Sequence, residues 1–185
     1  MIGVLVSGEG TNLQALLDAG LPVRAVASNV EGARALARAA AAGIPTAVFG
    51  LGDYASRAER DTAMAGWLAH HGVEVVVCAG YMHLLTPSFL DRFPAINVHP
   101  SLLPAFPGTR AIEDALAAGV SETGVTVHFL DEGVDTGPVI AQERVAVEPG
   151  DTPETLRARV RAAEHRLLPE VARRYVAGGL RSPGT

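Results

Sequence analysis

Short apolar runs alternate along the first hundred residues with longer segments of helical periodicity. The strand-like runs lie at residues 2–6, 23–27, 46–49, 73–79 and 95–98. The helical segments between them lie at residues 12–19, 32–42, 56–71 and 87–92. Strands that alternate with helices predict right-handed crossovers and a parallel sheet.

The pattern changes in the second half of the chain. Residues 124–130 and 139–147 read as two strands joined by a polar loop, which predicts antiparallel pairing at that end of the sheet. Residues 155–177 predict a long helix, with Thr152-Pro153 as its cap signal. We therefore expect an α/β fold: a single Rossmann-like domain over residues 1–185, with helices on both faces of a mostly parallel open sheet. Residues 181–185 are expected to form a frayed tail.

Composition narrows the function classes. A hydrophobic content of 48% with 19% charged residues excludes global disorder, and 5% aromatic residues predict an aliphatic core. A net charge of −5 without a basic block argues against non-specific binding to nucleic acid. All basic residues are Arg, so a catalytic Lys is excluded, and the one cysteine, Cys78, reads as an inert small hydrophobe. The first apolar run is too short to span a membrane and has no basic leader, so we expect a soluble, cytoplasmic protein.

In an open α/β sheet, ligands bind at the carboxyl ends of the parallel strands. The first strand is followed by Ser7-Gly8-Glu9-Gly10-Thr11-Asn12, where glycines and a helix N-terminus together favour a phosphate. The alternative is a plain tight turn with Thr11 or Asn12 as helix cap. Glu9 would repel an anion, so its side chain is expected to face solvent.

A second polar group follows the strand at 95–98. Alternation places Asn97 and His99 on one face of the strand, and Pro100, Pro104 and Pro107 stiffen the loop after them. An amide donor held beside an imidazole suits an oxyanion site. The alternative is a buried histidine that is hydrogen-bonded for structural reasons.

A third polar group, residues 130–138, joins the last two strands. Asp135 is the best placed of its carboxylates, because Gly137-Pro138 imposes a defined turn after it. A solvated acidic hairpin is the alternative, and contact between Asp135 and His99 would decide between the two. His128, in the preceding strand, is expected either to support the site or to belong to the core. Adjacent His70 and His71 close a helix and do not indicate a metal site.

Five motifs appear in order along the chain: Ser-Gly-x-Gly-Thr-Asn-Leu at 7–13, Ala-Gly-Tyr-Met at 79–82, Asn-Val-His-Pro-Ser-Leu-Leu-Pro at 97–104, Val-Asp-Thr-Gly-Pro-Val at 134–139 and Glu-His at 164–165. Together they closely resemble the phosphoribosylglycinamide formyltransferases, also called glycinamide ribonucleotide transformylases, over essentially the whole chain. The resemblance implies transfer of a formyl group from the co-substrate 10-formyltetrahydrofolate to the amine of glycinamide ribonucleotide in purine biosynthesis. It implies small-molecule substrates, no metal, no nucleic acid or membrane partner, and a monomer or homodimer.

The resemblance also implies roles for particular residues. Asn97 and His99 would be oxyanion donors, and Asp135 would hold His99 charged and help to move protons. The residues implied for glycinamide ribonucleotide are Gly10, Thr11, Asn12, Leu13, Arg161 and Glu164. The residues implied for folate are Arg57, Met82, His83, Leu84, Leu85, Asn97, Asp131, Glu132, Gly133, Val134 and Asp135.

The sequence departs from the family pattern at two positions. His83 stands where many relatives carry Arg, and Glu9 replaces a neutral residue in the phosphate loop. Three alternatives stay open. The first is another 10-formyltetrahydrofolate enzyme, such as a hydrolase or a methionyl-tRNA formyltransferase, although both usually carry a further domain. The second is a non-catalytic folate or nucleotide-binding module, and the third is an oxidoreductase on a dinucleotide fold, which the incomplete glycine fingerprint disfavours.

Overall fold

The computed structural model describes residues 1–180, within which seven strands form one sheet in the order β3-β2-β1-β4-β5-β6-β7. Strands β1 (Ile2–Val6), β2 (Val23–Ser28), β3 (Thr46–Val48), β4 (Val75–Cys78) and β5 (Ala95–His99) pair in parallel. Strands β6 (Glu122–Phe129) and β7 (Val139–Ala146) extend the sheet antiparallel. The predicted fold class is confirmed, and the expected tail at 181–185 lies outside the described residues.

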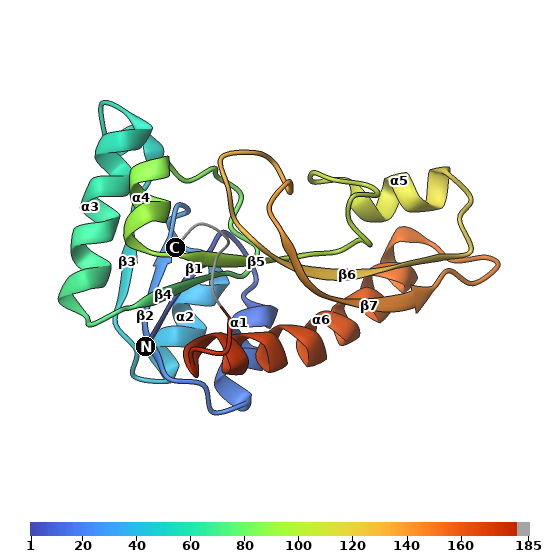
Figure 1. The fold of residues 1–185 in the computed structure, drawn as a ribbon, viewed down its shortest axis with the longest axis horizontal. Helices are drawn as coiled ribbons and strands as arrows, with labels where there is room; N and C mark the ends of the chain where they lie inside the picture. Colours follow the sequence, from blue (N-terminus) through green and yellow to red (C-terminus); the bar gives the residue numbers. More distant parts are fainter. Residues whose placement is uncertain (181–185) are drawn as a thin grey trace.

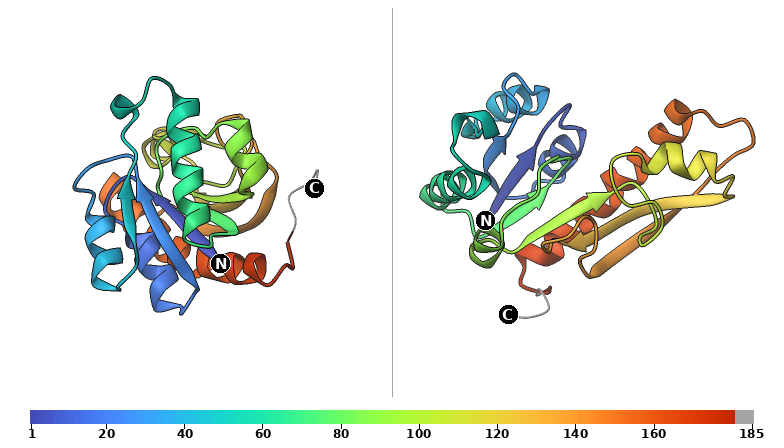
Figure 2. Two further views of the ribbon diagram at one scale, coloured as in Figure 1. Left: turned by 90° about the vertical axis from the view of Figure 1, so that its left-hand side faces the viewer. Right: turned by 90° about the horizontal axis from the view of Figure 1, so that it is seen from above.

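Helices cover both faces of the sheet (Figures 1 and 2). They are α1 (Thr11–Asp18), α2 (Arg34–Ala41), α3 (Arg57–His70), α4 (Pro87–Arg92), α5 (Ala111–Ala117) and α6 (Pro153–Val176), with a 3₁₀ turn at Leu51–Asp53. The helix α5 was not predicted, because only Ala111, Ile112 and Ala115 of its seven residues are buried and give it little periodicity. Within the described residues, no helix is long and apolar enough to cross a membrane.

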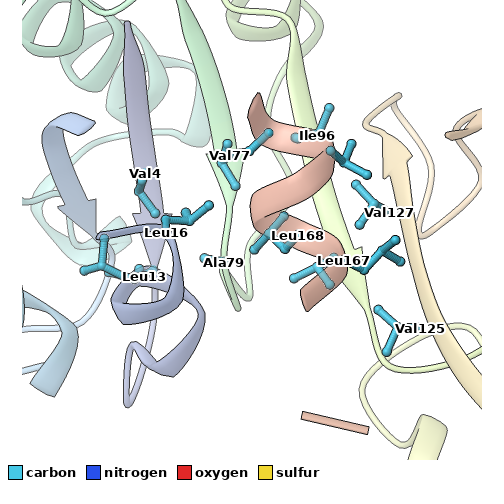
Figure 3. Close-up of a cluster of buried hydrophobic side chains, with 14 of the residues drawn as sticks. Val4, Leu13, Leu16, Val77, Ala79, Ile96, Val125, Val127, Leu167 and Leu168 are labelled. Atoms are coloured by element: carbon cyan, nitrogen blue, oxygen red, sulfur yellow. The ribbon is translucent and has the colours of Figure 1, made fainter. Parts of the chain in front are cut away.

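The core is aliphatic and lies in two layers. On one face, side chains of β1, β4 and β5 pack against α1, α2 and α6, as Figure 3 shows for Val4, Leu16, Ile96 and Leu168. On the other face, α3 and α4 cover Leu5 and the apolar residues of β2 and β4. The strands in the middle of the sheet are therefore buried on both sides, which explains their nearly continuous apolar sequences.

Helix α6 packs against both the antiparallel end of the sheet and helix α1. It begins at a capping box, in which the Thr152 side chain accepts from Thr155 N–H and the Thr155 hydroxyl accepts from Thr152 N–H. It then runs beneath the sheet in Figure 1, in contact with β6 and β7 and also with α1. The cap signal at Thr152-Pro153 is confirmed, although the helix starts two residues before the predicted boundary.

Candidate active site

A cavity of about 450 Å³ opens where the carboxyl ends of β1, β4 and β5 face α6 and the β6–β7 connection. Its size is that of a small-molecule site. Two thirds of the predicted site residues line this cavity: Thr11, Asn12, Met82, His83, Leu84, Asn97, His99, Gly133, Val134, Asp135, Arg161 and Glu164. The structure thus brings together segments that are far apart in the sequence.

The predicted contact between Asp135 and His99 is present. Asp135 Oδ2 lies 3.3 Å from His99 Nδ1, and both side chains are largely buried. His99 Nε2 lies 2.9 Å from the carbonyl oxygen of Phe106. Both ring nitrogens therefore lie close to acceptors, Nδ1 to the Asp135 carboxylate and Nε2 to the Phe106 carbonyl.

Asp135 is held in an ionised form by its surroundings. Burial raises the pKa of its carboxyl, but the His128 side chain, the Gly108 N–H and the positive charge at His99 together outweigh burial and lower the pKa below its usual value. The Gly108 N–H donates to Asp135 Oδ2 at 2.8 Å. The Asp135 carboxylate is therefore ionised at neutral pH and available as an acceptor beside His99.

Asp135 itself and Phe106, the two residues that face the His99 ring nitrogens, have left-handed backbones although they carry side chains. Phe106 has φ of 53° and Asp135 has φ of 55°. Such conformations cost on the order of 1–3 kcal/mol and persist where the surroundings impose them. Here Phe106 offers its carbonyl to His99, and Asp135 offers its carboxylate to His99 and Gly108. The strain therefore coincides with the contacts that fix the imidazole.

Asn97 and His128 face each other across the β5–β6 pairing. Their Cα atoms are register partners, and Asn97 Nδ2 lies 3.2 Å from His128 Nε2. His128 is fully buried, and its Nε2 is also 3.7 Å from Asp135 Oδ1. The sequence left the role of His128 open; the structure places it behind the site, where it contacts two of the three predicted catalytic residues without lining the cavity.

The N-terminus of α1 forms the other end of the cavity. Gly10 has φ of 73°, and no side chain caps the helix. A Cβ atom at Gly10 would lie 2.5 Å from that of Ala35, so the turn requires glycine. Glu9 points away to Arg34 at the surface, as predicted. The first amides of α1 are therefore free of a side-chain cap at a cavity that Arg157 and Arg161 also line.

Helix α6 contributes an acid beside this end. Glu164 Oε2 accepts a hydrogen bond of 3.2 Å from Asn12 Nδ2. Burial raises the pKa of Glu164, against the opposing effects of Asn12 and the Arg161 guanidinium. The Asn12 Oδ1 atom is buried and has no partner within the described residues, so a ligand donor would satisfy it.

Six predicted site residues do not line the cavity: Gly10, Leu13, Arg57, Leu85, Asp131 and Glu132. Gly10 shapes the loop, whereas Leu13 and Leu85 are core side chains. Asp131 instead caps its own loop, through Gly133 N–H and the Thr136 hydroxyl. Arg57 is exposed in the first turn of α3; the arginine that reaches the cavity wall is Arg60, three residues later.

Several lining residues were not predicted: Cys78, Gly80, Tyr81, Val98, Pro100, Gly108, Thr109, Ile112, Leu130, Arg157 and Val160. Six of these eleven lie within two residues of a predicted one, whereas Gly108, Thr109, Ile112 and Arg157 reach the cavity from a loop and from helix positions that gave no signal in the sequence. Cys78 is buried, and burial raises the pKa of its thiol to about 12, which makes it unreactive. Within residues 1–180, no three His, Cys, Asp or Glu side chains gather as a metal site.

Comparison with known proteins agrees with this geometry. Residues 1–172 match the family model described as formyl transferase. The phosphoribosylglycinamide formyltransferase of Mycobacterium tuberculosis is 48% identical over 171 residues, covering 89% of this chain and 80% of that protein. The trifunctional purine biosynthetic protein adenosine-3 of Chironomus tentans is 44% identical over 97% of this chain, which spans only 14% of that longer protein.

Solved structures give the same result. The crystal structure of glycinamide ribonucleotide transformylase 1 from Symbiobacterium toebii superposes with a TM-score of 0.95 at 46% identity, covering 99% of this chain and 90% of that one. Sequence and fold therefore agree over nearly the full length, and the chain belongs to the formyl transferase family.

Proposed function

We propose that this chain transfers the formyl group of 10-formyltetrahydrofolate to the amine of glycinamide ribonucleotide, releasing tetrahydrofolate. The observation that carries the proposal is the convergence of Asn97, His99 and Asp135 on a cavity that also contains the open N-terminus of α1. One end of the cavity suits an anion, and the other suits a developing oxyanion.

The reaction begins when the amine lone pair attacks the formyl carbon. A carbon–nitrogen bond forms, and the formyl oxygen becomes an oxyanion. One N–H of the Asn97 amide faces His128, and the second N–H remains for this oxygen. The amine then loses a proton, N10 of the folate gains one, and the bond between N10 and the formyl carbon breaks.

His99 manages protons in this scheme, and Asp135 keeps it charged. In the structure both nitrogens of His99 are already engaged, with Asp135 and with the Phe106 carbonyl. The ring therefore donates to the substrate by exchanging one of these two bonds. The bond to Phe106 is the one to exchange, because the bond to Asp135 maintains the charge that makes the ring a donor.

Glycinamide ribonucleotide spans the end of the cavity between α1 and α6. Its phosphate binds at the amides of Thr11 and Asn12 with Arg161 nearby, which combines a helix N-terminus with a guanidinium. Glu164 and the unpartnered Asn12 Oδ1 are acceptors for the N–H and O–H groups of the rest of the substrate. The glycine amine then points toward His99.

The folate co-substrate lies against the part of the cavity that is formed by the segment after β4 and by the β6–β7 connection. Met82, Leu84 and Val134 are large apolar side chains that line the cavity and are exposed, as expected of a surface that packs against the flat rings of a ligand. Formyl transfer to an amine needs charge stabilisation and proton movement, which Asn97, His99 and Asp135 supply without a metal. We propose that the protein works in the cytoplasm on small molecules, without nucleic acid or membrane partners, as a monomer or homodimer; the acidic net charge of −5 supports the exclusion of nucleic acid.

The test is an assay with 10-formyltetrahydrofolate in the presence and absence of glycinamide ribonucleotide, followed by mass spectrometry of the products. We expect formylated glycinamide ribonucleotide and tetrahydrofolate in equal amounts, and neither product without the acceptor. Formate release that is independent of the acceptor would indicate a hydrolase. Binding of both compounds without turnover would indicate a non-catalytic module.

A further inference from the structure

Arg60, in the first turn of α3, has no exposed surface. A fully buried arginine is rare and requires compensation of its charge. Its neighbour Asp61 supplies this: Asp61 Oδ1 accepts from Arg60 Nε at 2.8 Å and from Arg60 Nη2 at 2.5 Å. Both side chains are buried, so the pair is a fixed charged unit inside the protein.

The remaining polar atoms of this pair all contact one segment. Arg60 Nη1 lies 2.7 Å from His83 Nδ1, and Arg60 Nη2 donates to the Leu84 carbonyl at 3.2 Å. Asp61 Oδ2 accepts from the Thr86 N–H at 2.7 Å. This segment, residues 82–86, lies between β4 and α4 and belongs to neither a helix nor a strand. A buried ion pair therefore fixes an irregular wall at three points.

His83 links Arg60 to a second set of hydrogen bonds, which involves Asn29, Ser7 and Met82. Arginine can only donate, so His83 Nδ1 accepts, and the proton of the neutral ring is on Nε2. His83 Nε2 lies 3.3 Å from the Asn29 amide, and the Ser7 hydroxyl joins that amide to the N–H of Met82. Exchanging the oxygen and nitrogen of the Asn29 amide gives the His83 N–H its acceptor, and the amide nitrogen then donates to the Ser7 hydroxyl oxygen.

We propose that Arg60 is a positioning residue that, through His83 and Leu84, holds residues 82–86 in the shape that binds the folate co-substrate. This rests on the proposed function, because it assigns the wall to folate. Arg60 does not line the cavity, and it acts through the side chain and backbone that do. The hydrogen bonds of Arg60 go to Asp61, His83 and Leu84, and none goes to the α1 loop or to the Asn97–His99–Asp135 cluster, so its effect should fall mainly on folate binding.

The experiment compares KM for each substrate, and kcat, in Arg60→Lys, His83→Phe and His83→Gln. Lysine keeps a charge for Asp61 but cannot reach His83 and Leu84 together, and phenylalanine removes the acceptor of the ring. For both we expect KM for 10-formyltetrahydrofolate to rise about tenfold, with kcat and KM for glycinamide ribonucleotide within about twofold of wild type. Glutamine restores an acceptor, so His83→Gln should have a lower folate KM than His83→Phe. Arg92→Lys, on the exposed face of α4, is the matched control.

Two outcomes would overturn the proposal: equal folate KM values in His83→Phe and His83→Gln, or a loss spread equally over both substrates and kcat. If Arg60→Lys fails to fold, the two His83 variants still decide, because they leave the buried ion pair in place. Calorimetric binding of tetrahydrofolate separates this proposal from the proposed function. Wild type that binds tetrahydrofolate but transfers no formyl group contradicts the function alone, whereas transfer with unchanged folate KM in the variants contradicts the positioning role alone.

Discussion

The two ends of the cavity are built by different means. At the α1 end, the backbone determines the shape: Gly10 adopts a left-handed conformation pressed against Ala35, and the helix amides provide the binding groups. At the β5–β6 end, side chains determine it: His99 and Asp135 are held by one another and by the Phe106 and Gly108 backbone. The first end should therefore be sensitive to added atoms, and the second to changes of charge and hydrogen bonding.

This difference follows from what each end must do. A phosphate has the same charge before and after formyl transfer, so a fixed set of amides serves throughout. The formyl oxygen acquires charge only during the reaction, and groups that respond to that charge raise the rate. Four substitutions test the contrast, beginning with the largest expected effect.

Asp135→Asn should reduce kcat by roughly 10³-fold, because the imidazolium of His99 loses its counter-charge. Asparagine still offers an oxygen to the Gly108 N–H, so the fold should survive. Steady-state kinetics and the thermal unfolding midpoint measure the two effects separately. Near-normal turnover, or a large fall in the midpoint, would contradict the charge-based role.

Asn97→Ala should reduce kcat by roughly 10²–10³-fold, the usual result of removing one oxyanion donor. The KM values should change less, because the amide acts on the charge that develops during the reaction. The same kinetic assay distinguishes the two parameters. An effect on KM alone would mean that Asn97 binds the ground state instead.

Gly10→Ala should act through structure. The new Cβ would meet Ala35 at 2.5 Å, and the positive φ would add strain, together on the order of 1–3 kcal/mol of lost stability. We expect a higher KM for glycinamide ribonucleotide and a lower unfolding midpoint in denaturant. Gly8→Ala is the matched stability control, because a Cβ there meets nothing within 4 Å. Equal stability of the two variants would show that the turn adapts.

Glu164→Gln should have the smallest and most pH-dependent effect on stability. Because folding raises the pKa of Glu164, the group adds stability below the pKa of the unfolded chain and loses it as the pH rises through the folded value. Glutamine does not titrate, so the variant should be more stable than wild type at pH 7 to 8, with the advantage vanishing below about pH 4. Unfolding curves across this range measure the difference, and a constant offset would contradict the assignment to Glu164.

Much of the arrangement was predictable because it depends on periodicity and on strand ends. The alternation of apolar runs gave the parallel sheet, and the change of pattern after residue 123 gave β6 and β7. Asn97, His99 and Asp135 stood out because polar side chains at the ends of apolar strands have few structural uses. The sequence predicted contact between His99 and Asp135 only as the test of a catalytic role, and the distance of 3.3 Å between His99 Nδ1 and Asp135 Oδ2 shows that the contact exists.

The less predictable features depend on contacts between distant segments. Arg57 and Arg60 look alike in the sequence, and only the packing of α3 against residues 82–86 buries one and exposes the other. The Phe106 carbonyl that contacts His99 and the Gly108 N–H that contacts Asp135 are backbone groups, which every residue type carries, so the sequence could not single them out. His128 alternates with core residues as any buried strand residue does, and its partners became visible only with the β5–β6 register.

Helix α6 presents Arg161 and Glu164 to the cavity from a single rigid rod. Three residues of α-helix advance about 4.5 Å along the axis, so the guanidinium and the carboxylate leave the helix from positions that are nearly one turn apart. Under the proposed function, α6 therefore fixes where the contacts to the anionic group and to the hydrogen-bond donors of the substrate begin. A ligand whose anionic group and hydrogen-bond donors do not match this spacing loses one contact or the other, and substrate length is thereby selected without any moving part.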